Sequence, residues 1–445
     1  MTSQLLFDVG SNTNELLVYS KEVSPRLSYI IKVLFHDRAR ITTSKAILWA
    51  HEGARINYST EKIETVFQIM PHGLLTEQGI REQFVTCSQW KDLPIFFQTN
   101  GELPFDLFAA AFYLVSRYEE YLPNKPDQYG RYAHTSSLAY KEGFLRLPLV
   151  NCWLQHFEEA LQARFGSSLK VSVSKFRFLP TYDIDIAYAY RHQPLWKNLM
   201  GFFRDLLQGK MEKVMERGNV YSGRQKDPFD VFGWLDELHA KHKLTPAYFF
   251  LTIIKRGLYD KNLLANSRGL QRLYRRLAAV YVTGIHPSWQ SGTEEELLVS
   301  EKQTLEGIVG HKIFVSRFHY LRFNLPHSYR RLIATGMTDD HSMAYGAVNG
   351  FRASYALPYR WYDLEKEQIT HLVIHPFCFM EATAFFEQGY TAEEARDEMQ
   401  YFHDAVQKVN GEFITLFHNH FLTEQPEWVA WRNMYEDFLE KNFGN

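Results

Sequence analysis

The chain has 445 residues, of which 22% are charged and 45% hydrophobic, and its formal net charge is −2. This length predicts two domains, and the lack of a basic excess argues against a nucleic-acid-binding protein. The three cysteines, Cys87, Cys152 and Cys378, have no paired spacing, which argues against a disulfide framework. The sequence shows neither a basic start followed by an apolar run nor about 18 consecutive apolar residues. We therefore expect a cytoplasmic protein without a transmembrane helix.

The first 170 residues predict a small α/β domain of unknown role. Short strands are predicted at residues 16–19, 46–50 and 94–97. Residues 29–35 fit either a strand or a helix. The apolar run at residues 105–121 predicts a buried helix, on which Arg117 and Glu120 lie three residues apart and can form an ion pair. A further helix is predicted at about residues 150–165.

From residue 176 to the C-terminus, strand-like runs alternate with longer helical segments. Strands are predicted at residues 176–183, 245–251, 280–286, 313–318, 338–343, 371–375 and 412–418. Helices are predicted at residues 195–207, 229–242, 270–279, 294–309, 328–335, 392–408 and 428–441. Such alternation is typical of a parallel sheet or a (β/α) barrel, in which the chemistry lies at the carboxyl ends of the strands. We predict an α/β protein with a smaller N-terminal α/β domain at residues 1–170 and a (β/α) barrel at residues 176–445.

Polar side chains gather at the ends of these predicted strands. They are Asp183, Asp185, His286, Arg317, His319, Tyr320, Asp339, Asp340, His341, His375 and His418. A histidine in such a place can bind a metal ion or transfer a proton, and an arginine can pair with a carboxylate. Each of these residues taken alone is more often structural. Together and in this order they favour a hydrolytic site.

Asp183 and Asp185 are separated by one residue, so in a continuing strand their carboxylates point to the same side. Two like charges so close together need a compensating cation or proton. One interpretation is a metal-binding carboxylate beside a general base. The other is a pair of turn or helix-capping aspartates, and these residues alone leave both open.

Four segments resemble, in chain order, the motifs of the polysaccharide deacetylase family, also called the NodB-homology domain or carbohydrate esterase family 4. They are TYDID at residues 181–185, GIHPS at 284–288, SRFHY at 316–320 and LFH at 416–418. The resemblance covers about residues 176–445. It implies a distorted (β/α) barrel that removes acetyl groups from N-acetylated sugars with a divalent metal ion. The longer phrases TYDIDIAYAY, SRFHYLRF, GFRASYALPY and FDLFAAAFYLVSRYEEY resemble a bacterial subgroup that carries an extra N-terminal domain.

The same resemblance implies catalytic roles for individual residues. Asp183 would be the base that takes a proton from water, and Arg317 would orient it. His418 would protonate the departing amine, with His375 as a rival for this role. Tyr320 or its backbone amide would help to hold the oxyanion. The predicted substrate-binding residues are Tyr320, His319 and Trp289.

Asp185 and His286 are the metal ligands that the resemblance implies. The family's motif H-[ST]-x-x-H supplies a second histidine four residues after the first, and this chain has Gln290 at that position. An amide oxygen can bind a hard cation but is a poor zinc ligand. Gln290, His319 or His341 could therefore complete the ligand shell, or the metal differs or is absent. The expected cofactor is a divalent ion, zinc or another first-row metal.

These roles predict a hydrolase that removes acetyl groups from N-acetylated or O-acetylated saccharides by metal-assisted attack of water. Two alternatives stay open. One is a catalytically impaired barrel that acts as a saccharide-binding or assembly module, and the other is a metal-dependent hydrolase of a non-sugar amide. The expected partner is a saccharide, an activated sugar or a lipid-linked precursor. We also expect the N-terminal domain to cover the mouth of the barrel.

Overall fold

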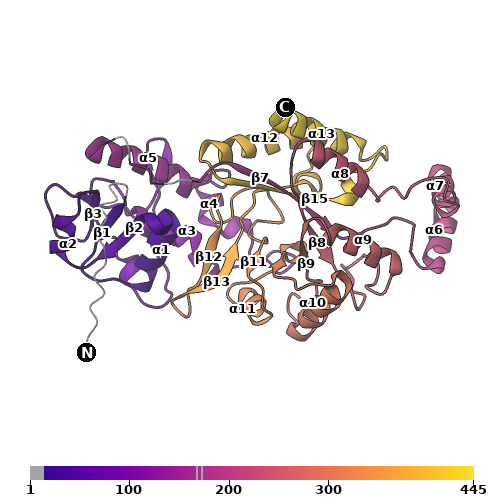
Figure 1. Cartoon of the computed structure of the whole chain (residues 1–445), viewed down its shortest axis with the longest axis horizontal. Coiled ribbons are helices and arrows are strands. Elements are labelled where there is room, and N and C mark those ends of the chain that lie inside the picture. The colour runs from indigo at the N-terminus through magenta and orange to yellow at the C-terminus, as the bar shows by residue number, and fades with distance from the viewer. Residues whose placement is uncertain (1–14, 167–168, 172–173, 445) are drawn as a thin grey trace.

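Two larger β-sheets and the helices around them organise the chain (Figure 1). The computed structural model describes residues 15–166, 169–171 and 174–444. A four-stranded sheet lies in the N-terminal part and a nine-stranded sheet in the remainder, with a small hairpin of β5 (Ser88–Trp90) and β6 (Leu93–Ile95). The predicted α/β class is therefore confirmed. Among the described residues, no helix combines the length and apolarity that crossing a bilayer requires.

The N-terminal sheet has the strand order β2-β1-β3-β4, and all its strands are parallel. Its strands are β1 (Leu16–Tyr19), β2 (Ala39–Thr42), β3 (Ala54–Tyr58) and β4 (Phe67–Ile69). The α-helices of this part are α1 (Pro25–Phe35), α2 (Lys45–Ala50), α3 (Leu107–Val115), α4 (Leu138–Lys141) and α5 (Leu149–Phe165). The strand predicted at residues 46–50 is wrong, because Ser44 caps α2 there by accepting a hydrogen bond from the backbone N–H of Ile47 at 3.4 Å. Residues 29–35 are helical, since they continue α1.

The helix predicted at residues 105–121 ends early, because Arg117 has a left-handed backbone with a φ of 57°. Its buried guanidinium pairs with Glu119 at 2.8 Å and with Glu120 at 2.7 Å. Glu120 also pairs with Arg352 of the C-terminal part at 2.6 Å. The predicted pair of Arg117 and Glu120 is confirmed, and it belongs to a buried network that joins the N-terminal part to the segment between β11 and β12.

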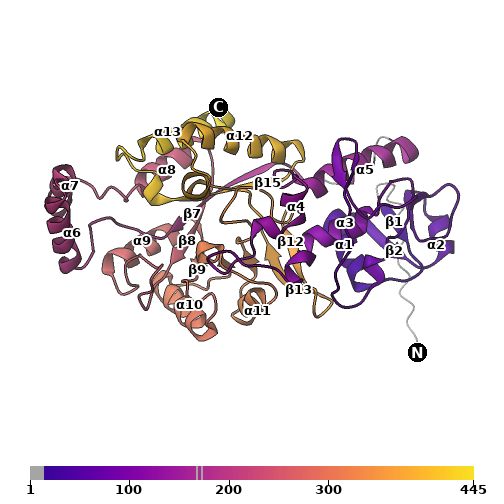
Figure 2. The same ribbon diagram turned by 180° about the vertical axis from the view of Figure 1, so that it is seen from behind.

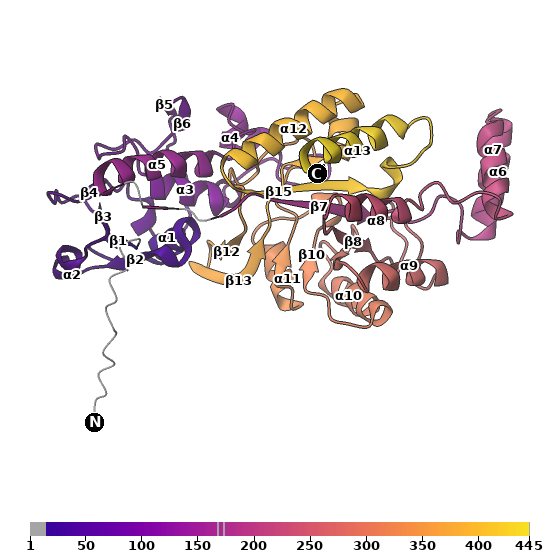
Figure 3. The ribbon, with the colours of Figure 1, turned by 45° about the horizontal axis from the view of Figure 1, so that its top comes forward.

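The nine-stranded sheet has the order β12-β13-β11-β10-β9-β8-β7-β15-β14 and is curled into a half-barrel. All neighbours are parallel except β12 and β13. Its strands are β7 (Arg177–Ile184), β8 (Ala247–Leu251), β9 (Val282–His286), β10 (Val315–Ser316), β11 (Asp339–Asp340), β12 (Tyr359–Asp363), β13 (Gln368–Ile374), β14 (Phe379–Met380) and β15 (Glu412–His418). Its helices are α6 (Leu195–Leu207), α7 (Met211–Tyr221), α8 (Phe232–Lys241), α9 (Arg268–Ala278), α10 (Glu295–Val309), α11 (His327–Ala334), α12 (Ala392–Lys408) and α13 (Val429–Phe443). Figure 3 shows α12 and α13 on one side of the sheet and α10 and α11 on the other.

Two strands are much shorter than predicted. β10 and β11 have two residues each, where the sequence pattern predicts strands at residues 313–318 and 338–343. Buried Asp340 accepts hydrogen bonds from the hydroxyl of Ser316 at 3.0 Å and from the backbone N–H of Ser342 at 2.9 Å. These side-chain hydrogen bonds take the place of the backbone hydrogen bonds between the two strands, and the chain turns here. Asp340 therefore has a structural role.

The register of the central strands brings their polar ends together. Asp183 at the end of β7 lies opposite His418 at the end of β15. His286 ends β9 opposite Leu251 of β8. Because all these strands are parallel, their carboxyl ends meet at one edge of the sheet.

Candidate active site

A cavity of about 550 Å³ opens at this edge of the sheet. Among the residues that line it are Asp183, Asp185, His286, His319 and His418. The first two come from the end of β7, and the histidines come from β9, the turn after β10 and the end of β15. The fold therefore gathers side chains that are far apart in the sequence.

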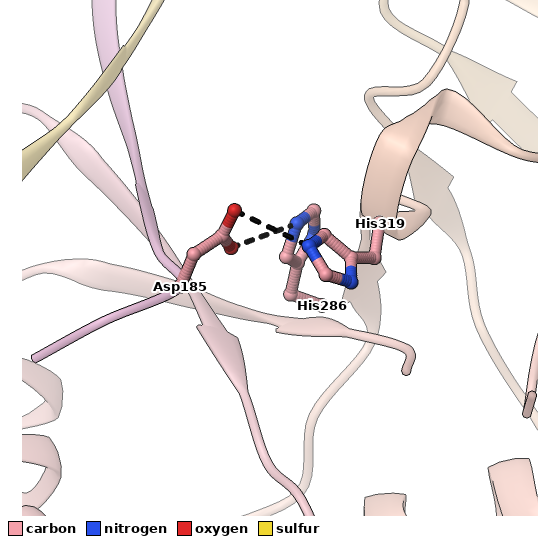
Figure 4. Close-up of side chains that lie close together, drawn as sticks. All are labelled: Asp185, His286 and His319. Atoms are coloured by element: carbon pink, nitrogen blue, oxygen red, sulfur yellow. Dashed lines mark ion pairs between the residues drawn. The ribbon is translucent and has the colours of Figure 1, made fainter. Parts of the chain in front are cut away.

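Asp185, His286 and His319 form a group that could hold a metal ion (Figure 4). One ligand atom from each residue lies within 4.8 Å of the other two. The Nε2 atoms of His286 and His319 each lie 3.3 Å from an oxygen of Asp185. Both imidazole rings point toward that carboxylate in Figure 4, so the three donors converge on one point.

The second nitrogen of each ring is held by a neighbour. His286 donates from Nδ1 to the backbone carbonyl of Arg317 at 2.5 Å, and His319 donates from Nδ1 to Asp260 Oδ1 at 2.9 Å. These bonds leave the two Nε2 atoms free as ligands, which is the usual arrangement for a metal-binding histidine. Two imidazoles and a carboxylate suit zinc and other first-row divalent ions.

The charges of this group also favour a cation. Burial by itself raises the pKa of Asp185, but His319 and His286 outweigh it and hold that pKa well below its usual range. Burial lowers the pKa of His319, but Asp185 and Asp260 raise it to about 9. Oδ1 of Asp185 is buried without a hydrogen-bond partner among the described residues. A positive charge is thus stabilised here, and a divalent ion fits the donor set.

Asp183 lies beside this group and is held by Arg317. Arg317 Nη1 donates to Asp183 Oδ1 at 2.9 Å, and both side chains are buried. The other oxygen, Oδ2, lies 3.5 Å from His286 Nε2. Arg317 is itself fixed by the backbone carbonyl of His341 at 2.9 Å and by the ring of Phe249, 4.1 Å from its guanidinium carbon. One carboxylate oxygen is therefore anchored while the other faces the metal-binding group.

His418 lies on another side of Asp185 and has a carboxylate partner. Its Nε2 is 3.4 Å from Asp185 Oδ2, and its Nδ1 donates to Glu381 Oε1 at 2.7 Å. Burial lowers the pKa of His418, but Glu381 and Asp185 raise it well above its usual value. The two carboxylates therefore favour the protonated form of His418, in which Nε2 can donate a proton.

Glu381 and Asp260 are the side chains that the sequence analysis missed. Glu381 follows the two-residue strand β14, which pairs with β15, and it is fully buried beside His418. Asp260 lies in the segment between β8 and α9. The only sequence signal for Glu381 is an acidic residue directly after the apolar run at residues 377–380.

Besides Arg317 and Asp340, five residues named from the sequence lie outside the cavity lining: Gln290, Trp289, Asp339, His341 and His375. Gln290 belongs to the turn before α10, where its backbone carbonyl accepts hydrogen bonds from the backbone N–H groups of Thr293 and Glu294. Trp289 stacks on Tyr259, with 4.0 Å between the ring centroids. His375 pairs with Asp339 at 2.9 Å and stacks on His341. In this structure His319, and not Gln290 or His341, is the side chain beside Asp185 and His286.

The N-terminal half of the chain also contributes to the cavity through Gln128, Tyr129 and Arg131. Arg131 Nη1 donates to the backbone carbonyl of Tyr320 at 2.9 Å, and Tyr129 packs on Tyr320 with 5.4 Å between ring centroids. Gly346 allows this approach, because a Cβ there would lie 1.8 Å from Arg131 Nη1. Tyr129, Tyr259 and Tyr320 give the cavity an aromatic wall.

Comparison with known proteins gives partial matches. A family model described as "Family of unknown function (DUF7033)" matches residues 16–166. No curated protein matches the chain. The solved structures that resemble about 60% of this chain include the following three, each with a TM-score below 0.4. A probable polysaccharide deacetylase from Pseudomonas aeruginosa PAO1 is 12% identical with a TM-score of 0.37, over 60% of this chain and 84% of its own. The Puue allantoinase is 10% identical with a TM-score of 0.35, over 60% and 83%. A polysaccharide deacetylase from Bacillus cereus is 10% identical with a TM-score of 0.30, over 60% and 88%. The chemistry of this chain has to be inferred from its own side chains.

Proposed function

We propose that this protein is a metal-dependent hydrolase with a NodB-type half-barrel that removes acetyl groups from N-acetylated or O-acetylated saccharides. One observation carries the proposal. Asp185, His286 and His319 converge on one point, with the Asp183–Arg317 pair on one side and the His418–Glu381 pair on another. A metal-binding group between a carboxylate and a protonated histidine is the arrangement that amide hydrolysis by water requires.

Asp185, His286 and His319 would hold the divalent ion, which when bound acts as a Lewis acid toward the acetyl carbonyl. Asp183 takes a proton from the attacking water, whose oxygen bonds to the carbonyl carbon. Arg317 keeps the Asp183 carboxylate in place. His418 gives its Nε2 proton to the departing nitrogen as the C–N bond breaks, so the products are acetate and an amine.

The walls of the cavity suit a saccharide. Its volume of about 550 Å³ lies in the range of small-molecule sites. Tyr129, Tyr259 and Tyr320 offer ring faces on which a sugar can stack, and Arg131 and Lys261 offer hydrogen-bond donors. The proposed substrate is a soluble, activated or lipid-linked saccharide, and we propose that the reaction takes place in the cytoplasm.

Two measurements test this proposal. Purified wild-type protein should bind about one zinc ion per chain, and Asp185→Ala should lose it, since two histidines alone make a weak site. A screen of acetylated oligosaccharides, nucleotide sugars and simple amides should then show acetate release from a saccharide. Asp183→Asn should keep the metal but lose about 100-fold or more of that release, because a general base of this kind contributes about that much.

Three outcomes would overturn the proposal. Unchanged acetate release in Asp183→Asn would remove the base from the mechanism. Saccharide binding without metal would identify a binding module instead. Hydrolysis of simple amides but not of acetylated saccharides would identify a different substrate class.

A further inference from the structure

A helical hairpin projects from the half-barrel beside the cavity. It consists of α6 and α7 and is inserted between β7 and α8. Figure 1 and Figure 2 show both helices standing apart from the sheet, at the end of the molecule opposite the N-terminal sheet, and Figure 3 shows the same from above. The half-barrel is complete without this insertion, so the exposed surface of the hairpin needs a separate explanation.

The apolar side of α6 faces outward. Six of its side chains are at least 49% exposed and are here called the apolar stripe: Leu195, Trp196, Leu199, Met200, Phe203 and Leu207. Their spacing of three and four residues places them on one face of the helix. The exposed fraction is 57% for Trp196, 58% for Phe203 and 88% for Leu207. An amphipathic helix of a globular protein normally turns this face to the core.

The polar side of α6 faces inward instead. The buried residues of this helix are Asn198 and Asp205. Arg217 of α7 donates to Asn198 Oδ1 at 3.0 Å and to Asp205 Oδ2 at 2.7 Å. Gly201 makes room for this arginine, because a Cβ there would lie 2.6 Å from its guanidinium. Polar contacts therefore hold the two helices together and leave the apolar stripe free.

The base of the hairpin is also fixed by polar contacts. Tyr190 donates to Glu216 at 2.7 Å, and Gln425 donates to the same carboxylate at 3.1 Å. Asp227 accepts hydrogen bonds from the backbone N–H groups of Ala189, Tyr190 and Arg191. These contacts fix the hairpin in the orientation in which the apolar stripe faces outward.

The hairpin has a net positive charge, whereas the whole chain has a net negative charge. The hairpin and its flanking segments, residues 191–226, contain eight arginines and lysines and three acidic residues, whereas the whole chain has a net charge of −2. Lys197 and Arg204 lie along one border of the apolar stripe, and Arg204, although it pairs with Asp205 at 3.1 Å, keeps an exposed side chain. Lys210 is exposed in the turn between the helices. A second copy of the hairpin would bring the same positive charge, which disfavours self-association. A surface of anionic lipid complements both the stripe and the basic residues.

We propose that the α6–α7 hairpin docks the protein onto a bilayer that contains anionic lipids, with the apolar stripe in the interfacial layer. α6 has 13 residues and α7 has 11, both fewer than the roughly 20 that span a bilayer, so the hairpin lies in the interface. A groove at its base shares Ile186 and Lys261 with the lining of the active-site cavity. This inference does not depend on the proposed catalytic activity.

Co-sedimentation of the full-length protein with vesicles tests the docking. One set of vesicles contains equal parts of phosphatidylglycerol and phosphatidylcholine, and the other contains phosphatidylcholine alone. We expect wild-type protein to pellet with the anionic vesicles, and the double variant Trp196→Ser/Phe203→Ser to lose at least about tenfold in affinity. The matched control is Trp49→Ser/Phe84→Ser, since both rings are exposed in the N-terminal part, and it should bind as wild type does.

A charge variant keeps the test independent of the apolar substitutions. Arg204→Gln/Lys210→Gln should weaken binding to the anionic vesicles, and added salt should weaken binding of the wild type. The proposal is overturned if wild-type protein pellets with neither set of vesicles, or if hairpin and control variants bind equally. It is also overturned if light scattering shows a dimer that the hairpin variant disrupts while vesicles do not bind, because a second copy would then be the occupant.

Discussion

Asp260 offers a test of the metal centre that removes no ligand. The carboxylate accepts a hydrogen bond from His319 Nδ1 at 2.9 Å and from the backbone N–H of Trp289 at 3.0 Å, and the residue is 4% exposed. Asp260→Asn keeps the size of the side chain but removes the charge that fixes the histidine with Nε2 free. Loss of such a partner weakens metal affinity by about 10–100-fold, or roughly 1.4–2.7 kcal/mol.

Isothermal titration calorimetry with zinc measures this effect. Asp363→Asn is the matched control, because Asp363 is also buried and pairs with Arg330 outside the cavity lining. We expect the zinc Kd to rise by about 10–100-fold in Asp260→Asn and to stay unchanged in the control. The reasoning is refuted if Asp260→Asn binds zinc as tightly as wild type while His319→Ala binds none.

Two further predictions concern histidines with acidic partners. Glu381→Gln removes the largest charge that raises the pKa of His418, so the alkaline limb of the pH profile for acetate release should move to lower pH while zinc binding persists. An unmoved limb would contradict the role of Glu381. Burial lowers the pKa of His375, but Asp339 and Glu412 raise it to about 9, above an unfolded value of about 6.5. The protonated form therefore stabilises the fold by up to about 3 kcal/mol below about pH 6.5, and this is lost as the pH rises through about 9. Urea unfolding should show His375→Gln less stable than wild type at about pH 6, with the difference gone by about pH 10, and a constant difference would contradict the assignment.

Strand ends were the most informative feature of the sequence. Apolar runs locate the central strands β7, β8 and β15, because these are buried along nearly their whole length and need largely apolar residues. Parallel pairing then forces the residues at their carboxyl ends together. This is why Asp183, His286 and His418 meet in one cavity although more than 230 residues separate the first from the last.

Contacts that depend on loops could not be predicted in this way. Glu381 follows a strand of two residues, and Asp260 lies in an irregular segment, so neither has a periodic pattern around it. The amphipathic pattern of α6 predicts an apolar face but not what covers it. Since Arg217 reaches Asp205 from a second helix, the exposure of that face follows from a tertiary contact.

Gln290 stands where the motif that this sequence resembles has a second histidine, but this by itself does not remove a ligand from the site. A shell built on H-[ST]-x-x-H takes two histidines from one segment, whereas His286 ends β9 and His319 lies in the turn after the neighbouring strand β10. Ser316 of β10 pairs with Ile285 of β9, and adjacent strands lie about 4.8 Å apart. A side chain just beyond one strand can therefore reach the same point as a side chain at the end of the next. His319 does so with its Nε2 atom 3.3 Å from Asp185, so a two-histidine, one-carboxylate shell can form without the motif's spacing.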